Sequence, residues 1–145
     1  MTNRIYEEEK ILPLIVPQSM NAGATVTGAY VSLSGGMHDV LFAVNFGALP
    51  EGKKVTVEVF EATDDQGTGA TEIEAAETIY TSPTGGVNSG QVLVSLKLAS
   101  FSKEYATVKV TNDKATALLG NADMILDLAI HSKDANSQAS AVKVV

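Results

Sequence analysis

Strict alternation of apolar and polar residues is the feature that most constrains what this chain can fold into. In residues 38–46 every second residue is a large apolar one, namely Val40, Phe42, Val44 and Phe46. Side chains with this period of two share one face of an extended chain, so the segment is predicted to be a strand with one buried face. The same alternation recurs in residues 53–61, 92–98, 105–111 and 124–130. The apolar positions of these segments are Val55, Val57, Val59, Val92, Val94, Leu96, Leu98, Ala106, Val108, Val110, Met124, Leu126, Leu128 and Ile130.

Turn-forming residues separate these segments. Glycine pairs such as Gly35-Gly36, and the proline and glycines of residues 83–86, interrupt the alternation where a chain reversal is needed. Pro50 and Gly52 are predicted to form a tight turn between two neighbouring antiparallel strands, because proline presets a negative φ and glycine accepts a positive one. This punctuation favours strands over helices.

Helix is expected to be scarce. Only residues 72–77 and 114–119 contain fair helix formers, and both stretches are too short to be stable helices on their own. Strands spaced by 10 to 15 residues with glycine-rich turns indicate two packed sheets or a barrel. The predicted fold is therefore all-β: an antiparallel β-sandwich of the jelly-roll or Ig-like type, with an N-terminal arm and little helix.

The chain of 145 residues is expected to form one domain with two softer ends. Residues 1–23 mix charges, prolines and small polar residues and are predicted to be an N-terminal arm. Residues 24–131 contain the alternating segments and are predicted to be the β-sandwich body. Residues 132–145 are predicted to be a tail. Within the tail, residues 141–145 are apolar enough to pair as a late strand, on their own sheet or on that of a neighbouring subunit.

Charge and composition exclude several classes of function. Seventeen acidic residues against ten Lys and Arg give a net charge of −7, the wrong sign for binding nucleic acid. The absence of cysteine removes disulfides, thiolate zinc sites and cysteine nucleophiles. Residues 1–10 carry three glutamates where a secretory signal needs positive charge, and the apolar residues 11–17 are too few to span a bilayer. We therefore expect synthesis in a cytoplasm and no membrane partner.

Residues that could carry chemistry are few. Asp64 and Asp65 are candidate metal ligands, but they are adjacent rather than alternating, which favours an ordinary turn over a calcium loop. His38 and His131 are the only histidines and cannot form a metal site without carboxylates. No serine stands in a G-x-S-x-G motif, and a glycosidase-type carboxylate pair is defined in space rather than in sequence. We expect no enzymatic activity and no cofactor.

Several short motifs follow one another along the chain. Val31-Ser32-Leu33 is followed by VLFAVNFGAL at residues 40–49, VTVEVFEATD at 55–64 and the turn Gly67-Thr68-Gly69. The later segments YATVKVT and ADMILDLAIH, residues 105–111 and 122–131, complete the series. In this order the motifs resemble a family of small tailed-bacteriophage virion proteins. The two ends of the chain have no counterpart in that resemblance.

The resemblance implies a capsid-associated structural protein, most simply a head decoration or auxiliary protein on the capsid surface of the virion, made in the host cytoplasm. Its partners would be the major capsid protein or other virion proteins, and a homo-oligomer is expected. A protein of this kind needs an arm or an edge strand that lies along a neighbouring subunit. The residues expected to make this contact are Ile11, Leu12, Leu14, Ile15, Val16, Val142 and Val144.

Two alternatives stay open at this point. One is a different virion role, as a tail-tube, neck or head-closure component, which predicts rings or tubes. The other is an extracellular β-sandwich binding module, because a fold does not determine a function.

Overall fold

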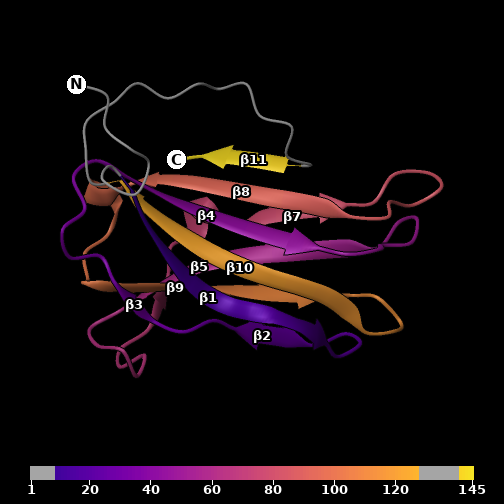
Figure 1. The fold of residues 1–145 in the computed structure, drawn as a ribbon, viewed down its shortest axis with the longest axis horizontal. Coiled ribbons are helices and arrows are strands. Elements are labelled where there is room, and N and C mark those ends of the chain that lie inside the picture. The colour runs from indigo at the N-terminus through magenta and orange to yellow at the C-terminus, as the bar shows by residue number, and fades with distance from the viewer. Residues whose placement is uncertain (1–8, 128–140) are drawn as a thin grey trace.

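The computed structural model describes residues 9–127 and 141–145, and more than half of this part is β-strand (Figure 1). The strands and the two 3-10 helices are β1 (Glu9–Met20), β2 (Thr25–Thr27), β3 (Val31–Ser32), β4 (Asp39–Phe46), β5 (Lys54–Ala62), β6 (Thr71–Glu72), η1 (Glu74–Ala76), β7 (Thr78–Thr81), β8 (Gly90–Lys97), η2 (Leu98–Ser100), β9 (Tyr105–Asn112), β10 (Leu118–Asp127) and β11 (Ala141–Val144). In this part of the chain, no helix is long and apolar enough to cross a membrane.

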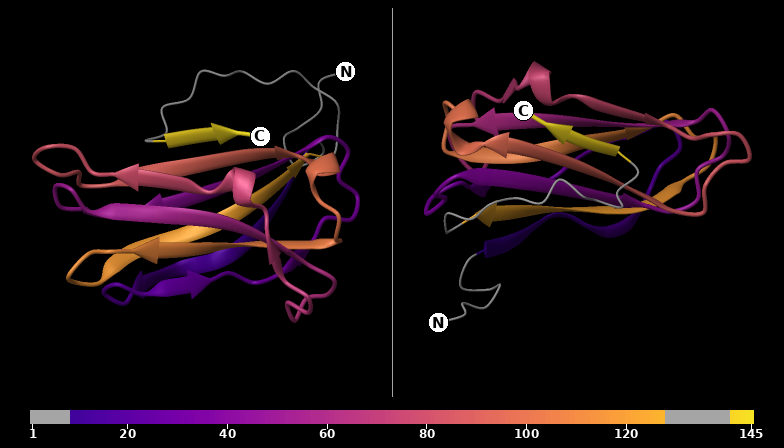
Figure 2. Two further views of the ribbon diagram at one scale, coloured as in Figure 1. Left: turned by 180° about the vertical axis from the view of Figure 1, so that it is seen from behind. Right: turned by 90° about the horizontal axis from the view of Figure 1, so that it is seen from above.

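The strands form two sheets stacked face to face (Figures 1 and 2). Sheet A has five strands in the order β1-β10-β4-β8-β11. Sheet B has six strands: the path β2-β9-β5-β6, with β3 also on β9 and β7 also on β5. All pairings are antiparallel except that of β11, which runs parallel to β8. The predicted β-sandwich is confirmed.

The pairing of the strands is nested. In sheet A, β1 pairs with β10, and β4 pairs with β8; in sheet B, β2 and β3 pair with β9, and β5 pairs with β6 and β7. The first half of the chain thus lies beside the second half throughout, as in a hairpin wrapped around a barrel, which is jelly-roll topology. Of the two predicted types of sandwich, the structure therefore has the jelly roll.

The turn at Pro50–Gly52 has a different role from the one predicted. The turn itself is present, because the N–H of Lys53 donates to the carbonyl of Pro50 (3.1 Å) and Gly52 has a φ of +73°. However, β4 belongs to sheet A and β5 to sheet B, so the turn does not join hydrogen-bonded neighbours. The prediction was wrong because a turn motif specifies a reversal of the chain and not the sheet that the next strand joins.

The core lies between the two sheets and consists largely of the predicted alternating residues. Each of these side chains is 3% exposed or less: Val40, Phe42, Val44, Phe46, Val55, Val57, Val59, Val92, Val94, Leu96, Ala106, Val108, Val110, Met124 and Leu126. Leu98, also predicted to be in the core, is partly buried against it in η2. The predicted core residues Leu128 and Ile130, and His131, lie outside the described residues.

The structure differs from the predicted arm over residues 9–20. These residues form β1, which pairs with β10 along its length and places Leu14 and Ile15 in the core. Two neighbouring residues can both face inward because the pairing shifts register between Pro13 and Ile15, as at a β-bulge. Prolines are tolerated here because β1 is an edge strand of sheet A.

A buried carboxylate ties the β8–β9 connection to β5. Glu61 is 7% exposed, and its carboxylate accepts hydrogen bonds from the backbone N–H of Ser102 (2.8 Å), the hydroxyl of Ser102 (2.6 Å) and the N–H of Lys103 (3.2 Å). Removing the acceptor leaves these donors without their partner in a partly buried site, which is costly.

We expect Glu61→Ala to lower the free energy of unfolding by about 2–3 kcal/mol, measured by urea denaturation. Glu61→Gln is the matched control, because its amide oxygen still accepts hydrogen bonds, and it should lose clearly less. An unchanged urea midpoint for Glu61→Ala would contradict this role for the carboxylate.

Candidate interaction surface

The outer face of sheet A is unusually apolar. Ile11, Ile125 and Leu41 are register partners across β1, β10 and β4 and form one row. Ile11 is 58% exposed, while Leu41 and Ile125 are half-buried. The next row contains Pro13, Asp123, Ala43 and Leu93. We call the six apolar residues of these two rows the apolar face: Ile11, Pro13, Leu41, Ala43, Leu93 and Ile125.

The outer face of sheet B is mainly polar. Thr56 pairs with Thr111, and Glu58 pairs with Lys109. The hydroxyls of Thr25 and Thr111 are 2.7 Å apart, and the ammonium of Lys109 lies over the ring of Phe60, 3.9 Å from its centroid. Polar and charged cross-strand pairs of this kind suit a face that meets water. Of the two outer faces, that of sheet A is therefore the candidate for contact with a partner protein.

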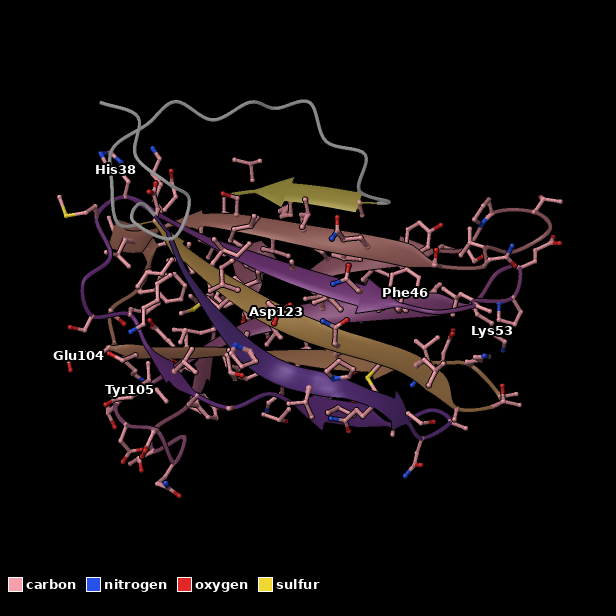
Figure 3. All side chains as sticks on the ribbon, in the orientation of Figure 1. His38, Phe46, Lys53, Glu104, Tyr105 and Asp123 are labelled. Atoms are coloured by element: carbon pink, nitrogen blue, oxygen red, sulfur yellow. The ribbon has the colours of Figure 1, made fainter. Side chains whose placement is uncertain are left out.

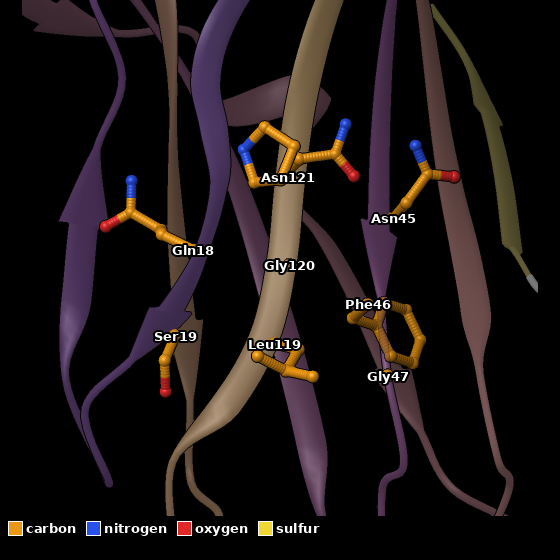
Figure 4. A pocket seen from close by; sticks show the side chains of 9 residues that line it. Gln18, Ser19, Asn45, Phe46, Gly47, Leu119, Gly120 and Asn121 are labelled. Atoms are coloured by element: carbon orange, nitrogen blue, oxygen red, sulfur yellow. The ribbon is translucent and has the colours of Figure 1, made fainter.

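A shallow groove of about 400 Å³ continues the apolar face toward the start of β10 (Figure 4). Asn45, Asn121 and Gln18 line it together with Leu119, which is 65% exposed. The amide of Gln91 donates to Asn45 Oδ1 (2.9 Å), and Asn121 Nδ2 donates to Asp123 Oδ2 (3.3 Å). The groove thus combines oriented amide groups with one exposed apolar side chain, the composition of an interface rim.

Beneath this groove, Gly120 lies on the core side of β10, facing the buried Met20. A Cβ at Gly120 would lie 2.6 Å from Met20 Cε and 3.0 Å from the carbonyl oxygen of Asn45. A side chain at Gly120 would therefore displace the end of Met20 and press on the β4 backbone at Asn45.

The structure divides the residues predicted to contact a partner. Ile11 is on the apolar face, and Val16 and Val144 are also exposed. Leu14 and Ile15 are buried in the core, and Leu12 is partly buried against it. Alternation directs Leu12 and Leu14 inward, and the register shift after Pro13 also turns Ile15 inward. The backbone of Val142 pairs with Leu93 in β11, and its side chain lies outside the described part of the structure.

Most of the apolar face escaped the sequence analysis. Leu41, Ala43, Leu93 and Ile125 occupy the side of their strands opposite to the predicted core. The available signal was a large apolar residue on the outward side of three different strands. Only the pairing of β10, β4 and β8 places these residues side by side.

The Asp64–Asp65 turn is closed by its own hydrogen bonds. Asp64 Oδ1 accepts from the backbone N–H groups of Gln66 and Thr68 (both 3.0 Å), and Asp65 Oδ1 accepts from the amide of Gln66 (3.2 Å). Hydrogen bonds from Thr68 lower the pKa of Asp64; the one from the Thr68 side chain has the larger effect and the one from its backbone the smaller. In the structure the Asp64 carboxylate therefore caps a loop.

Other titratable side chains are spread over the molecule. Figure 3 shows His38 at the same end of the sandwich as Glu104 and Tyr105, with Lys53 at the opposite end. Among residues 9–127 and 141–145, no three His, Asp or Glu side chains gather closely enough to hold a metal ion.

The side chain of Glu72, just before η1, makes the stability of the folded protein depend on pH. Burial raises the pKa of Glu72, and the charges of Glu58, Glu77 and Glu74 raise it further. Glu72 Oε1 is buried and has no hydrogen-bond partner among the described residues. A carboxyl whose pKa is higher in the folded than in the unfolded chain stabilises the folded state at pH values below its pKa in the unfolded chain, about 4.3. This stabilisation is lost as the pH rises through the pKa of the folded chain.

We therefore expect Glu72→Gln to raise the Tm at pH 7, with the difference from wild type disappearing below about pH 4. Scanning calorimetry between pH 3 and 7 measures this effect. Glu104→Gln, on an exposed residue at another site, removes the same charge and should change the Tm less. Equal shifts for the two variants would mean that net charge, and not the surroundings of Glu72, is responsible.

No family model matches this chain, and no curated protein matches it either. Solved structures do share its fold. The PBSX exported protein XepA superposes with a TM-score of 0.53 at 11% identity, over 96% of this chain and 43% of XepA. The VP2 subviral particle of infectious bursal disease virus gives a TM-score of 0.50 at 10% identity, over 83% of this chain and 33% of that one.

A second structure from the same virus, a derived T=1 particle, gives a TM-score of 0.51 at 10% identity, over 83% of this chain and 32% of that one. This chain thus spans less than half the length of each of the three. At such identities the similarity shows a common jelly-roll fold and nothing about partners or activity.

Proposed function

We propose that this chain is a bacteriophage virion structural protein that binds and stabilises an assembled shell, as a head decoration or auxiliary capsid protein. The partner is the major capsid protein or another protein of the capsid surface, and the role is not enzymatic. The apolar face of sheet A is the observation that carries the proposal.

The contrast between the two outer faces supports a docking role. A sheet that meets only water alternates inward apolar with outward polar residues, as sheet B largely does. Sheet A departs from this rule in two adjacent rows across β1, β10, β4 and β8, in which only Ser95 and Asp123 are polar. Ala43 itself is buried, but exposed and half-buried apolar side chains next to oriented amides are the usual composition of a protein-binding patch.

The fold is compatible with the same role. Two structures that share it are virus-derived particles, and the sequence motifs of residues 22–73 resemble those of phage virion proteins. A jelly roll whose core residues are almost completely buried is a stiff body, which suits a protein that holds a shell together.

Cosedimentation with mature phage heads stripped of auxiliary proteins tests the proposal. We expect saturable binding, with electron microscopy showing the protein at symmetry-related positions on the shell. Failure to bind heads, with rings or tubes formed instead, would assign the chain to the neck or tail. A monomer that does neither would support the extracellular binding module.

A further inference from the structure

The outer edge of β8 differs from every other sheet edge in the described part of the molecule. β1, at the opposite edge of sheet A, contains two prolines and two register shifts, which prevent regular pairing with another strand. At the edges of sheet B, β2, β3, β6 and β7 are only two to four residues long. These are the usual devices that protect an edge from adding a foreign strand.

β8 has none of these devices. It is eight residues long, contains no proline and pairs with β4 in unbroken register from Asp39–Lys97 to Phe46–Gly90. Its inward side chains, Val92, Val94 and Leu96, are completely buried. Without a further strand, the edge of β8 would present a regular row of free N–H and C=O groups, which is a template for strand addition.

The strand that covers this edge is β11, which lies outside the nested pairing of the jelly roll. β11 pairs with β8 in parallel over residues 141–144, and the N–H of Val145 donates to the carbonyl of Ser95 (2.8 Å). Ala141 and Val145 are only partly buried against the core, and Val144 is 75% exposed. The described contact thus consists of backbone hydrogen bonds and a few partly buried side chains, which any copy of the strand can supply.

The segment that connects β10 to β11 is longer than pairing within one chain requires. β10 ends at Asp127, one residue after Leu126, which is level with Leu96 of β8, whereas β11 begins level with Val92. The end of β10 is therefore five residues from the start of β11 along the strand direction and three strand positions across the sheet, a separation of about 22 Å. Thirteen residues, 128–140, join them, and an extended chain of that length spans roughly 43–47 Å. The connection is about twice as long as pairing within one chain requires.

From this geometry we infer that the β8 edge is an acceptor site for β11 of a second copy of the chain, and that neighbouring copies in an assembly are linked by exchange of residues 141–145. The pairs formed are the same within a chain and between chains, so local concentration decides which form is present. Because β11 and β8 belong to the same chain, their effective concentration is of order millimolar, so pairing within one chain dominates in dilute solution. Copies held side by side on a surface reach comparable local concentrations, and there exchange competes.

The absence of cysteine from the sequence allows a direct test without heads. Ser95 and Val144 are register partners, and adjacent strands place such Cα atoms about 5 Å apart, within the range of a disulfide. Full-length Ser95→Cys and Val144→Cys chains are mixed, oxidised at about 0.01 and about 1 mM, and analysed by non-reducing electrophoresis and mass spectrometry. The control mixture pairs Val144→Cys with Ser100→Cys, an exposed position in η2 beyond the register of β11.

We expect a Ser95–Val144 heterodimer at about 1 mM, at least tenfold above the level in the control mixture, and a strong decrease on dilution. In the double variant Ser95→Cys/Val144→Cys, the disulfide should be intramolecular in dilute protein and include intermolecular species in concentrated protein. An exclusively intramolecular disulfide at both concentrations, or equal cross-linking in the two mixtures, would overturn the inference. Either result leaves the head-binding test unaffected, because no shell is present.

Discussion

Replacing Phe42 by alanine is expected to lower the free energy of unfolding by about 3–5 kcal/mol, the usual cost of removing a large side chain from a core. Phe42 lies in the middle of β4, is completely buried and pairs with Met124 and Val94 on either side. Its ring also packs near that of Phe101, with centroids 6.4 Å apart. Backbone hydrogen bonds hold the strands of both sheets in place, so the sheets cannot close in to fill the cavity that the substitution leaves. Urea denaturation followed by circular dichroism measures the change.

Phe60→Ala is the matched control for this prediction. It removes the same side chain from the other sheet, but Phe60 is half-buried on the outer face of sheet B, where Lys109 lies over its ring. We expect a loss of about 1 kcal/mol, from a weakened cation–π contact and a smaller transfer of apolar surface. Equal losses for the two variants would contradict the assignment of the core to the space between the sheets.

Introducing charge on the outer face of sheet A is expected to abolish most of the binding to phage heads. Ile11→Lys and Leu119→Lys change two exposed residues on this face, 58% and 65% exposed, so the fold itself should lose less than about 1 kcal/mol. At an interface, a desolvated lysine in place of an apolar anchor costs about 2 kcal/mol or more. Together the two substitutions should weaken the affinity roughly 100- to 1000-fold, measured by cosedimentation over a concentration series.

Ile79→Lys provides the control, because Ile79 is 53% exposed but lies on β7 of sheet B. We expect its affinity for heads to stay within about threefold of wild type, since a charge outside the interface has little effect. If Ile79→Lys weakens binding as much as the double variant, a general effect of charge explains the result. If the double variant binds normally, the shell contacts another surface of the protein.

Local patterns predicted the interior of this protein well. The alternation in residues 38–46, 53–61 and 105–111 identified side chains that are almost all fully buried, because the pleat of a strand turns successive residues to opposite faces whatever the strand pairs with. The same patterns failed for residues 9–20, where prolines and a register shift hide the alternation of an edge strand. They also failed for the turn at Pro50–Gly52, which leads into the other sheet.

The candidate surface was only partly predictable. Ile11 and Val144 were expected at a contact surface and are exposed, whereas Leu14 and Ile15 belong to the core. The two rows of the apolar face are formed by residues far apart in the sequence, such as Ile11 and Ile125, which are 114 positions apart. No local pattern relates residues at such a distance.

By itself, the sequence determined that this chain is all-β, which residues of its regular strands face inward, and that turns and short segments rather than long helices connect them. These properties follow from period two and from the backbone preferences of glycine and proline, which act over a few residues. Only the tertiary structure decided that β1 closes sheet A, that the pairing is that of a jelly roll, that outward apolar residues of four strands meet on one face, and that β11 covers the edge of β8. Each of these depends on which distant strands pair, and a strand pattern specifies a buried face without specifying its neighbour.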